Sequence, residues 1–287
     1  MPPVAVVTDT THYLPREMVD ASGLQQVSLY VNWGGRQDRE ADLRDFDEYY
    51  DHLRVAADLP TTSQPSVGDF LAVYEPLVAA GRDVVSIHLS AGISGTYEAA
   101  LAAKARLDEQ GTKATIEVLD SATTAGGLGL VALAAAGSAG GGGDVEAVVR
   151  RALAAREALK LWFCLDTMEF LRRGGRVGAA RAWLGSTLKI KPILSIESQV
   201  TPVERVRTAA RAFERMVEYL RSRQEDGADA WVIQHIQARE QAERLVERGR
   251  GMFGCEPLFV SEVGPVVGTH VGPGLLGVGG IPSALLD

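Results

Sequence analysis

The stretch VVSIHLSAGISGTY, residues 84–97, decides the fold, because a strand pattern turns into a helix pattern within it. Residues 84–89 are a short apolar run typical of a buried strand, and residues 95–107 are predicted to form a helix. A second apolar run follows at residues 115–119. A strand, a helix and a strand in this order predict a βαβ unit and therefore a parallel sheet.

The rest of the N-terminal half repeats this alternation. Strands are predicted at residues 4–8 and 26–31, and helices at residues 45–54 and 67–80. Ser66 precedes Asp69 by three residues, which is the spacing of an N-cap with an acidic partner and marks the start of the second helix.

The pattern changes after residues 137–144, a segment with five glycines that we expect to be a linker or loop. The elements expected beyond it are helices at 144–159, 206–224 and 239–250, a short helix from 167, and strands at 161–165, 188–196, 199–203, 231–236, 258–263, 266–271 and near 276. We place a domain boundary near the glycine run or the helix after it.

The composition excludes several partners. The chain has 287 residues, and its 37 acidic residues exceed its 29 basic ones by 8. A negative protein repels phosphates at long range, so neither nucleic acid nor an anionic membrane surface is expected as a partner. Two long charge-free stretches, residues 121–143 and 263–286, are interrupted by glycine, so neither is expected to span a bilayer.

The cysteines and the amino terminus suggest a compartment. Cys164 and Cys255 are too far apart for a metal knuckle and too few for a disulfide framework, so a reducing cytoplasm is expected. The first nine residues contain no basic segment and no secretory apolar region follows, so no signal peptide is expected.

The loop at residues 90–97 is the first candidate site. Free backbone N–H groups and the positive end of the helix dipole face such a loop, which suits an anion such as a carboxylate or phosphate. The other interpretation is that Ser94 or Thr96 only caps the helix, and the sequence leaves both open. A nucleophile elbow is disfavoured, because Thr96 stands where the elbow requires glycine.

Two further segments carry polar groups. Thr61, Thr62 and Ser63 place three hydroxyls just before a helix, where they form either a turn or a set of uncharged anion donors. His270 lies among glycines at residues 268–274, which allow close backbone approach, and its imidazole can donate to an anion.

Other chemistry has weaker support. His88 and His235 lie within strand patterns and are interpreted as core or edge residues, and no histidine pair has metal-ligand spacing at helical period. Residues 127–132 match the loose G-x-G-x-x-A pattern, but the preceding strand ends too far upstream for a dinucleotide site. The sequence contains no P-loop motif.

Basic residues gather in one acid-free segment. Residues 170–196 contain Arg172, Arg173, Arg176, Arg181, Lys189 and Lys191, and Arg205 and Arg207 follow nearby. This group could meet a phosphate or an acidic partner, and the alternative is an ordinary solvated face.

Several of these segments coincide, in order, with the motifs of one family. They are VVTDT at 6–10 with Leu14 and Pro15, TSQPS at 62–66, LSAGISGTY at 89–97, DS at 120–121, LRRGGR at 171–176, LKIKPIL at 188–194, VRT at 206–208, and Gly268, His270 and GPG at 272–274. Each motif is weak alone, but their succession spans nearly the whole chain. The sequence resembles the DegV family of bacterial fatty-acid-binding proteins, which includes the acyl-binding subunits of fatty acid kinase.

The resemblance implies an α/β protein of two domains. Residues 1–155 would form an N-terminal α/β domain with a parallel sheet, and residues 156–287 a C-terminal α/β domain with a mixed sheet. A long-chain fatty acid would lie between or within them, its tail in an apolar tunnel, with no cofactor or metal. Thr62 and Ser94 would donate to the carboxylate with His270 close by. Additional candidates for this site are Thr61, Ser63, Gly95, Arg207 and Thr269.

The resemblance also implies a partner. In the kinase systems a separate ATP-dependent subunit phosphorylates the bound carboxyl group, and Arg172, Arg173 and Arg176 would dock it. The chain would then be a non-catalytic cytoplasmic carrier. The alternatives are an enzyme, a phosphotransferase or hydrolase using Ser94 or His270, and a binder of another amphipathic carboxylate. Acyl length, unsaturation and oligomeric state stay open.

Overall fold

The N-terminal half folds around a parallel sheet, as the βαβ pattern predicts. The computed structural model describes residues 3–43, 45–183 and 190–287. Four strands pair in the order β2-β1-β6-β7, and every pair is parallel. The strands are β1 (Val4–Asp9), β2 (Gln25–Val27), β6 (Asp83–His88) and β7 (Ile116–Asp120).

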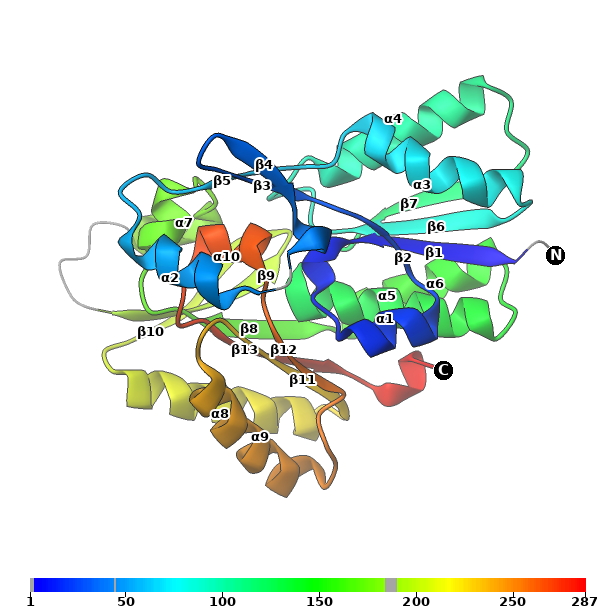
Figure 1. Ribbon diagram of the computed structural model, residues 1–287. Helices are drawn as coiled ribbons and strands as arrows, with labels where there is room; N and C mark the ends of the chain where they lie inside the picture. The colour runs from blue at the N-terminus through cyan, green and yellow to red at the C-terminus, as the bar shows by residue number, and fades with distance from the viewer. Residues whose placement is uncertain (1–2, 44, 184–189) are drawn as a thin grey trace.

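Helices cover both faces of this sheet. On one face lie α3 (Val67–Ala79) and α4 (Thr96–Glu109), and on the other lie α5 (Ala125–Gly140) and α6 (Val145–Ala158) (Figure 1). The short helix α1 (Arg16–Ser22) packs beside α5. The capping box that the sequence indicates at Ser66 is present, since the Asp69 amide donates to Ser66 Oγ and the Asp69 carboxylate accepts from the Ser66 amide.

The predicted strand at 26–31 is wrong as a single element. Its first part is β2, whereas its second part begins β3 (Tyr30–Trp33), which pairs with β4 (Arg36–Arg39) and β5 (Thr61–Ser63) in a separate antiparallel sheet. The chain leaves the first sheet at Leu29, whose amide donates to Thr10 Oγ1 instead of to a neighbouring strand. The helix α2 (Asp47–Val55) lies between β4 and β5 in the chain.

The C-terminal half contains a six-stranded mixed sheet in the order β10-β9-β8-β13-β11-β12. Among its pairs, β11 with β12 is parallel and the others are antiparallel. The strands are β8 (Lys160–Cys164), β9 (Lys191–Glu197), β10 (Gln199–Val206), β11 (Ala230–His235), β12 (Phe259–Glu262) and β13 (Leu276–Ile281). Together the two sheets confirm the predicted fold class.

The predicted start of β9 at residue 188 and the basic residue Lys189 lie outside the described residues.

The mixed sheet has a different cover on each face. The helices α8 (Ala209–Glu225) and α9 (Arg239–Phe253) pack on one face, and α5 packs against the other, so that α5 lies between the two sheets (Figure 1).

The predicted strand at 266–271 is also wrong, because this segment is the helix α10 (Pro265–Val271). Pro265 stands at its first position, where a missing N–H costs nothing. The Glu40 carboxylate accepts the Val266 amide (2.8 Å) and so satisfies a free donor of the first turn. The helix packs against α2, β3 and β5 of the N-terminal half and against α7 (Glu169–Arg173).

The glycine-rich segment at 137–144 is a linker only in part. Residues 137–140 are the last turn of α5, and residues 141–144 form the loop before α6. Gly137 is needed for packing, since a Cβ there would stand 2.0 Å from the Leu286 carbonyl oxygen. The predicted domain boundary at 155/156 falls near the end of α6 and stays a prediction.

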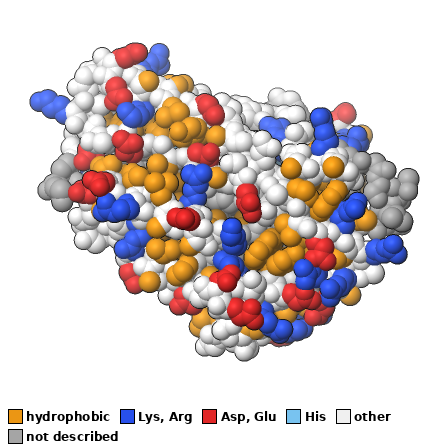
Figure 2. All heavy atoms as spheres, turned by 180° about the vertical axis from the view of Figure 1, so that it is seen from behind, with side chains coloured by type: hydrophobic (Ala, Val, Ile, Leu, Met, Phe, Trp, Pro, Cys, Tyr) orange, Lys and Arg blue, Asp and Glu red, His pale blue; other side chains and the backbone are white. Residues whose placement is uncertain are grey.

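The surface is mixed in charge. Figure 2, which views the molecule from behind, shows acidic and basic side chains interspersed, with hydrophobic side chains in several separate groups. On the described part of this face, no continuous basic field of the kind that nucleic acid requires is visible. Among the described residues, no helix is long and apolar enough to cross a membrane.

Candidate functional site

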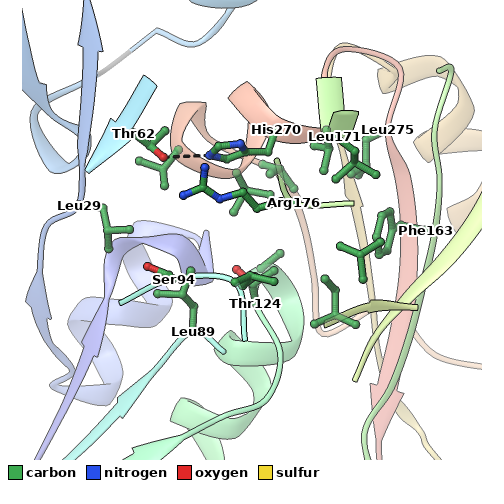
Figure 3. Close-up of a pocket in the computed structure, with 18 of the residues that line it drawn as sticks. Leu29, Thr62, Leu89, Ser94, Thr124, Phe163, Leu171, Arg176, His270 and Leu275 are labelled. Carbon is green, nitrogen blue, oxygen red and sulfur yellow. Dashed lines mark hydrogen bonds between the residues drawn. The ribbon is translucent and has the colours of Figure 1, made fainter. Parts of the chain in front are cut away.

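A cavity of about 380 Å³ lies where the parallel sheet, the small antiparallel sheet and the mixed sheet meet. The N-terminal half contributes the residues at the ends of β5 and β6 and the start of α5, and α10 contributes one wall (Figure 3). The mixed sheet contributes apolar side chains of β8 and the neighbouring segments, among them Leu161, Phe163, Leu171 and Leu275. The cavity is therefore polar at one end and apolar over most of its length.

Thr62 and His270 meet at the polar end. Thr62 Oγ1 lies 2.9 Å from His270 Nε2, although the two residues are 208 positions apart (Figure 3). Side chains alternate along a strand, so Thr61 and Ser63 point to the other face of β5, where Asn32 Nδ2 donates to both hydroxyls (3.4 and 2.6 Å). Thr62 is therefore the hydroxyl of this group that faces His270, while Ser63 borders the cavity and Thr61 does not.

Ser94 lies on the opposite side of the polar end, just before α4 (Figure 3). Its hydroxyl is 2.9 Å from Thr96 Oγ1 and accepts a long hydrogen bond from the Thr96 amide (3.4 Å). It therefore contributes to the helix start and borders the cavity at the same time. A Cβ at the neighbouring Gly95 would stand 2.3 Å from Gln64 Oε1, so a side chain there would displace the Gln64 amide.

His270 is uncharged near neutral pH. Burial, and to a lesser extent the positive charge of Arg176, lower the pKa of its imidazole to about 4. Its Nδ1 is buried and has no hydrogen-bond partner among the described residues. Gly174 makes room for the ring, because a Cβ there would stand 2.3 Å from Nδ1.

The three arginines expected to dock a partner differ in their surroundings. Arg176 borders the cavity, and Figure 3 shows its guanidinium between the Thr62–His270 pair and Ser94. Arg172 pairs with Glu169 at the surface (2.5 Å), and Arg173 donates to the Ala57 carbonyl (2.6 Å). All three side chains are exposed.

Two further candidates do not border the cavity. Arg207 is exposed beyond β10. Thr269 is buried on the far side of α10, where its hydroxyl donates to the Pro265 carbonyl (2.6 Å) and contacts Tyr49 Oη (2.6 Å). Neither residue therefore reaches the cavity, although Thr269 directly precedes His270 in the sequence.

The sequence did not predict that Thr124, Gln234 and Arg176 border the cavity. Thr124 stands at the start of α5 and donates to Thr11 Oγ1 (3.3 Å). Gln234 Oε1 accepts the Gly126 amide, and its Nε2 donates to Ser261 Oγ (3.0 Å). A glutamine in the middle of the apolar run WVIQHI is the signal that could have identified Gln234, because a buried amide needs specific partners.

A buried chain of hydrogen bonds lies beneath the site. Ser86 Oγ is 2.7 Å from His88 Nε2, and His88 Nδ1 is 3.2 Å from Asp9 Oδ2, the order of a hydrolase triad. All three residues have no exposed surface, and Ser86 Oγ also accepts from Tyr74 Oη (2.6 Å). Burial opposes the charge of Asp9, but hydrogen bonds from His88, Thr11 and the Leu89 amide outweigh it and lower the Asp9 pKa. Through Asp9 these hydrogen bonds connect Thr11, just after β1, to Leu89, just after β6.

The described residues contain no group of three or more His, Cys, Asp or Glu side chains able to hold a metal ion. Cys164 is buried and Cys255 is exposed, and both are free.

The fold and the cavity together define an α/β protein with a site that is polar at one end and mostly apolar elsewhere. A family model described as "Uncharacterised protein, DegV family" matches residues 3–283. The chain belongs to the DegV family.

Curated relatives support this assignment over the whole length. A DegV domain-containing protein of Streptomyces coelicolor is 38% identical over 281 residues, covering 96% of this chain and 97% of the relative. Protein DegV of Bacillus subtilis is 34% identical over 279 residues, covering 96% and 98%.

Two solved structures are similar throughout. The crystal structure of DegV from Bacillus subtilis, described as a fatty acid binding protein, has a TM-score of 0.88 and 32% identity, covering 98% of this chain and 100% of that one. A DegV family protein from Thermus thermophilus, solved for its fatty acid binding, has a TM-score of 0.86 and 30% identity, covering 98% and 99%.

Proposed function

We propose that this protein binds a long-chain fatty acid, with the carboxylate at Thr62, Ser94 and His270 and the acyl tail along the apolar part of the cavity. The observation that carries the proposal is the Thr62–His270 pair facing Ser94 at one end of a cavity that is otherwise mostly apolar. The description of the Bacillus subtilis and Thermus thermophilus relatives as fatty-acid binders supports the same ligand.

The chemistry of the polar end suits a carboxylate. The hydroxyl groups and the neutral imidazole are uncharged hydrogen-bonding partners, and the Arg176 guanidinium, which also borders this end, supplies a positive charge that attracts the carboxylate. The tail supplies most of the affinity, because each buried methylene contributes about 0.8 kcal/mol, and a long acyl chain on the order of 10 kcal/mol before ordering costs. A short acid without a tail is therefore expected to bind poorly.

The position of Arg176 supports presentation of the carboxyl group to a partner. Because Arg176 is exposed and also borders the cavity, the polar end lies close to the surface. We propose that Arg172, Arg173 and Arg176 dock an ATP-dependent fatty acid kinase subunit in the cytoplasm, and that the chain itself is not catalytic. Replacing Arg172 and Arg173, which do not border the cavity, should abolish acyl phosphate formation by the kinase while leaving fatty acid binding intact.

The proposed position of the ligand between the two halves of the chain also supports the proposed division into two domains. The cavity borders residues on both sides of position 155, in agreement with a fatty acid held between domains at 1–155 and 156–287. We propose these bounds for the two domains, and limited proteolysis with mapping of the cleavage site checks them.

The test of the proposed ligand begins with native mass spectrometry of the protein produced in bacteria, followed by titration with palmitate and oleate. The double variant Thr62→Val/Ser94→Ala loses two hydrogen bonds to a charged group, which we expect to lower affinity by on the order of 100-fold. Thr61→Ala is the matched control, since Thr61 lies on the same strand and points to the other face.

A wild-type protein that carries no long-chain acid and binds neither palmitate nor oleate would overturn the proposed ligand. Equal affinity in the double variant and in Thr61→Ala would overturn the site assignment. Preference for a cyclic amphipathic acid in competition with palmitate would favour a different carboxylate, and turnover of ATP or an ester by the chain alone would favour an enzyme.

A further inference from the structure

One row of residues crosses the mixed sheet at the floor of the cavity. Phe163 of β8, Gly277 of β13 and Gln234 of β11 are directly opposite one another in the register of the three strands. All three border the cavity. The residues before and after Gly277 in β13 are Leu276 and Val278. They point to the other face of the sheet and pack in the core under α8 and α9.

Gly277 leaves a hollow in this row. A Cβ at Gly277 would have its nearest neighbour, Phe163 Cβ, at 3.5 Å, which is ordinary contact. Gly279, two residues further on the same face, differs, because a Cβ there would stand 2.9 Å from Leu161 Cδ1 and 3.0 Å from the Lys160 carbonyl oxygen. The space above Gly279 is therefore filled, whereas the space above Gly277 belongs to the cavity.

The residues beside the hollow cannot close it easily. The Gln234 amide is held on both sides, by the Gly126 amide and by Ser261 Oγ. Leu275, which precedes Gly277 on the same face, is itself a wall of the cavity. The hollow is thus a fixed feature of the sheet rather than a gap that neighbouring side chains fill.

The floor lies away from the polar end. Figure 3 shows Phe163 and Leu275 across the cavity from Ser94 and Thr62. A ligand whose carboxylate is at Ser94 therefore directs its tail toward the row of Phe163 and Gly277. This step rests on the proposed function.

We propose that Gly277 sets the length of acyl chain that the protein accepts, because the hollow above it receives the distal methylenes. A side chain at position 277 would occupy that space and exclude them, while the carboxylate contacts at Thr62, Ser94 and His270 would be unaffected. The effect of a substitution should therefore grow with the length of the acid.

The experiment measures dissociation constants for lauric, myristic, palmitic and stearic acids, with native mass spectrometry of the acids that copurify. In Gly277→Val we expect stearic acid to bind about tenfold more weakly, equivalent to about two displaced methylenes, and lauric acid to bind as in the wild type. Gly277→Ala, whose Cβ fits without a clash, should show the same trend with a smaller factor.

Val278→Ala is the matched control, since it lies on the same strand and faces the opposite core. It should lower stability without any dependence on acid length. A Gly277→Ala protein that loses the same factor for every acid, or none for stearic acid, would overturn the role of Gly277. A wild-type protein that binds none of the four acids would instead overturn the proposed function, so the two failures are distinguishable.

Discussion

The two ends of the cavity are built in different ways. The polar end is assembled from β5, the loop before α4, and α10, three segments far apart in the chain that meet through side-chain contacts. The floor is one row of residues across β8, β13 and β11, held in register by the backbone ladder of a single sheet. The polar end therefore depends on close packing between elements, whereas the floor depends on strand register.

Glycines show this contrast. At the polar end, Gly95 and Gly174 allow close contact, because a Cβ at these positions would collide with Gln64 and His270 respectively. At the floor, Gly277 creates space instead of allowing contact. The same residue type allows close contact between elements at one end of the cavity and leaves open space at the other.

The largest expected effect comes from breaking the packing at the polar end with Gly174→Ala. The new Cβ would stand 2.3 Å from His270 Nδ1, so the ring must move away from Thr62. We expect palmitate affinity to fall at least about tenfold, the equivalent of one hydrogen bond to a charged group. Calorimetric titration measures it, with Gly251→Ala as the control, because a Cβ at Gly251 meets nothing within 4 Å. Unchanged affinity would show that the position of His270 is not critical.

A second prediction tests the floor through Gln234. Gln234→Leu leaves the Gly126 amide buried without an acceptor, which should lower the free energy of unfolding by about 1–3 kcal/mol. Urea denaturation measures this. Ser261→Ala, which removes only the other partner of Gln234, should cost less, about 1 kcal/mol. If both variants lower the free energy of unfolding equally, the hydrogen bond from the Gly126 amide of α5 is not what holds Gln234 in its row.

The smallest expected effect is a change in pH dependence through Glu40, which anchors α10 and hence His270. Burial raises the pKa of Glu40 from 4.5 to about 7, although the Thr10 hydroxyl, the Val266 amide and the Tyr13 hydroxyl all donate to its carboxylate. The folded protein therefore holds this proton more tightly than the unfolded chain does. Its contribution to stability is present below pH 4.5 and is lost as the pH rises through about 7.

Glu40→Gln should accordingly show a shallower loss of stability between pH 4.5 and 7 than the wild type, as measured by urea denaturation across that range. The pKa values of His12 and His270, both lowered to about 4, act in the opposite direction. They do so in both proteins, so the difference between the two curves isolates Glu40. Parallel curves would contradict the raised pKa.

Much of the fold follows from local patterns. The strands and helices around residues 84–119 are in place because apolar runs and capping signals act over a few residues. The segment at 266–271 was mispredicted because valines have high strand propensity, while the helix is stabilised by Pro265 and by the distant Glu40. The split of residues 26–31 likewise depends on Thr10, which no local pattern connects to Leu29.

The candidate site shows the same division. Its segments are recognisable in the sequence as hydroxyls before a helix, a strand-to-helix loop, and a histidine among glycines. The sequence leaves open which hydroxyl of Thr61, Thr62 and Ser63 faces the histidine, because alternation along a strand assigns opposite faces without saying which face meets α10. The pairing of β5 with β3 decides this.

The sequence by itself determined the α/β class, the parallel N-terminal sheet and the family to which the chain belongs, because these rest on short-range periodicity and on ordered motifs. Only the tertiary structure decided that Thr62 meets His270, that Arg176 borders the cavity and that Gly277 opens its floor. The physical reason is that a cavity is bounded by faces of separate elements, and the register and packing that bring those faces together are set by contacts between residues distant in the chain.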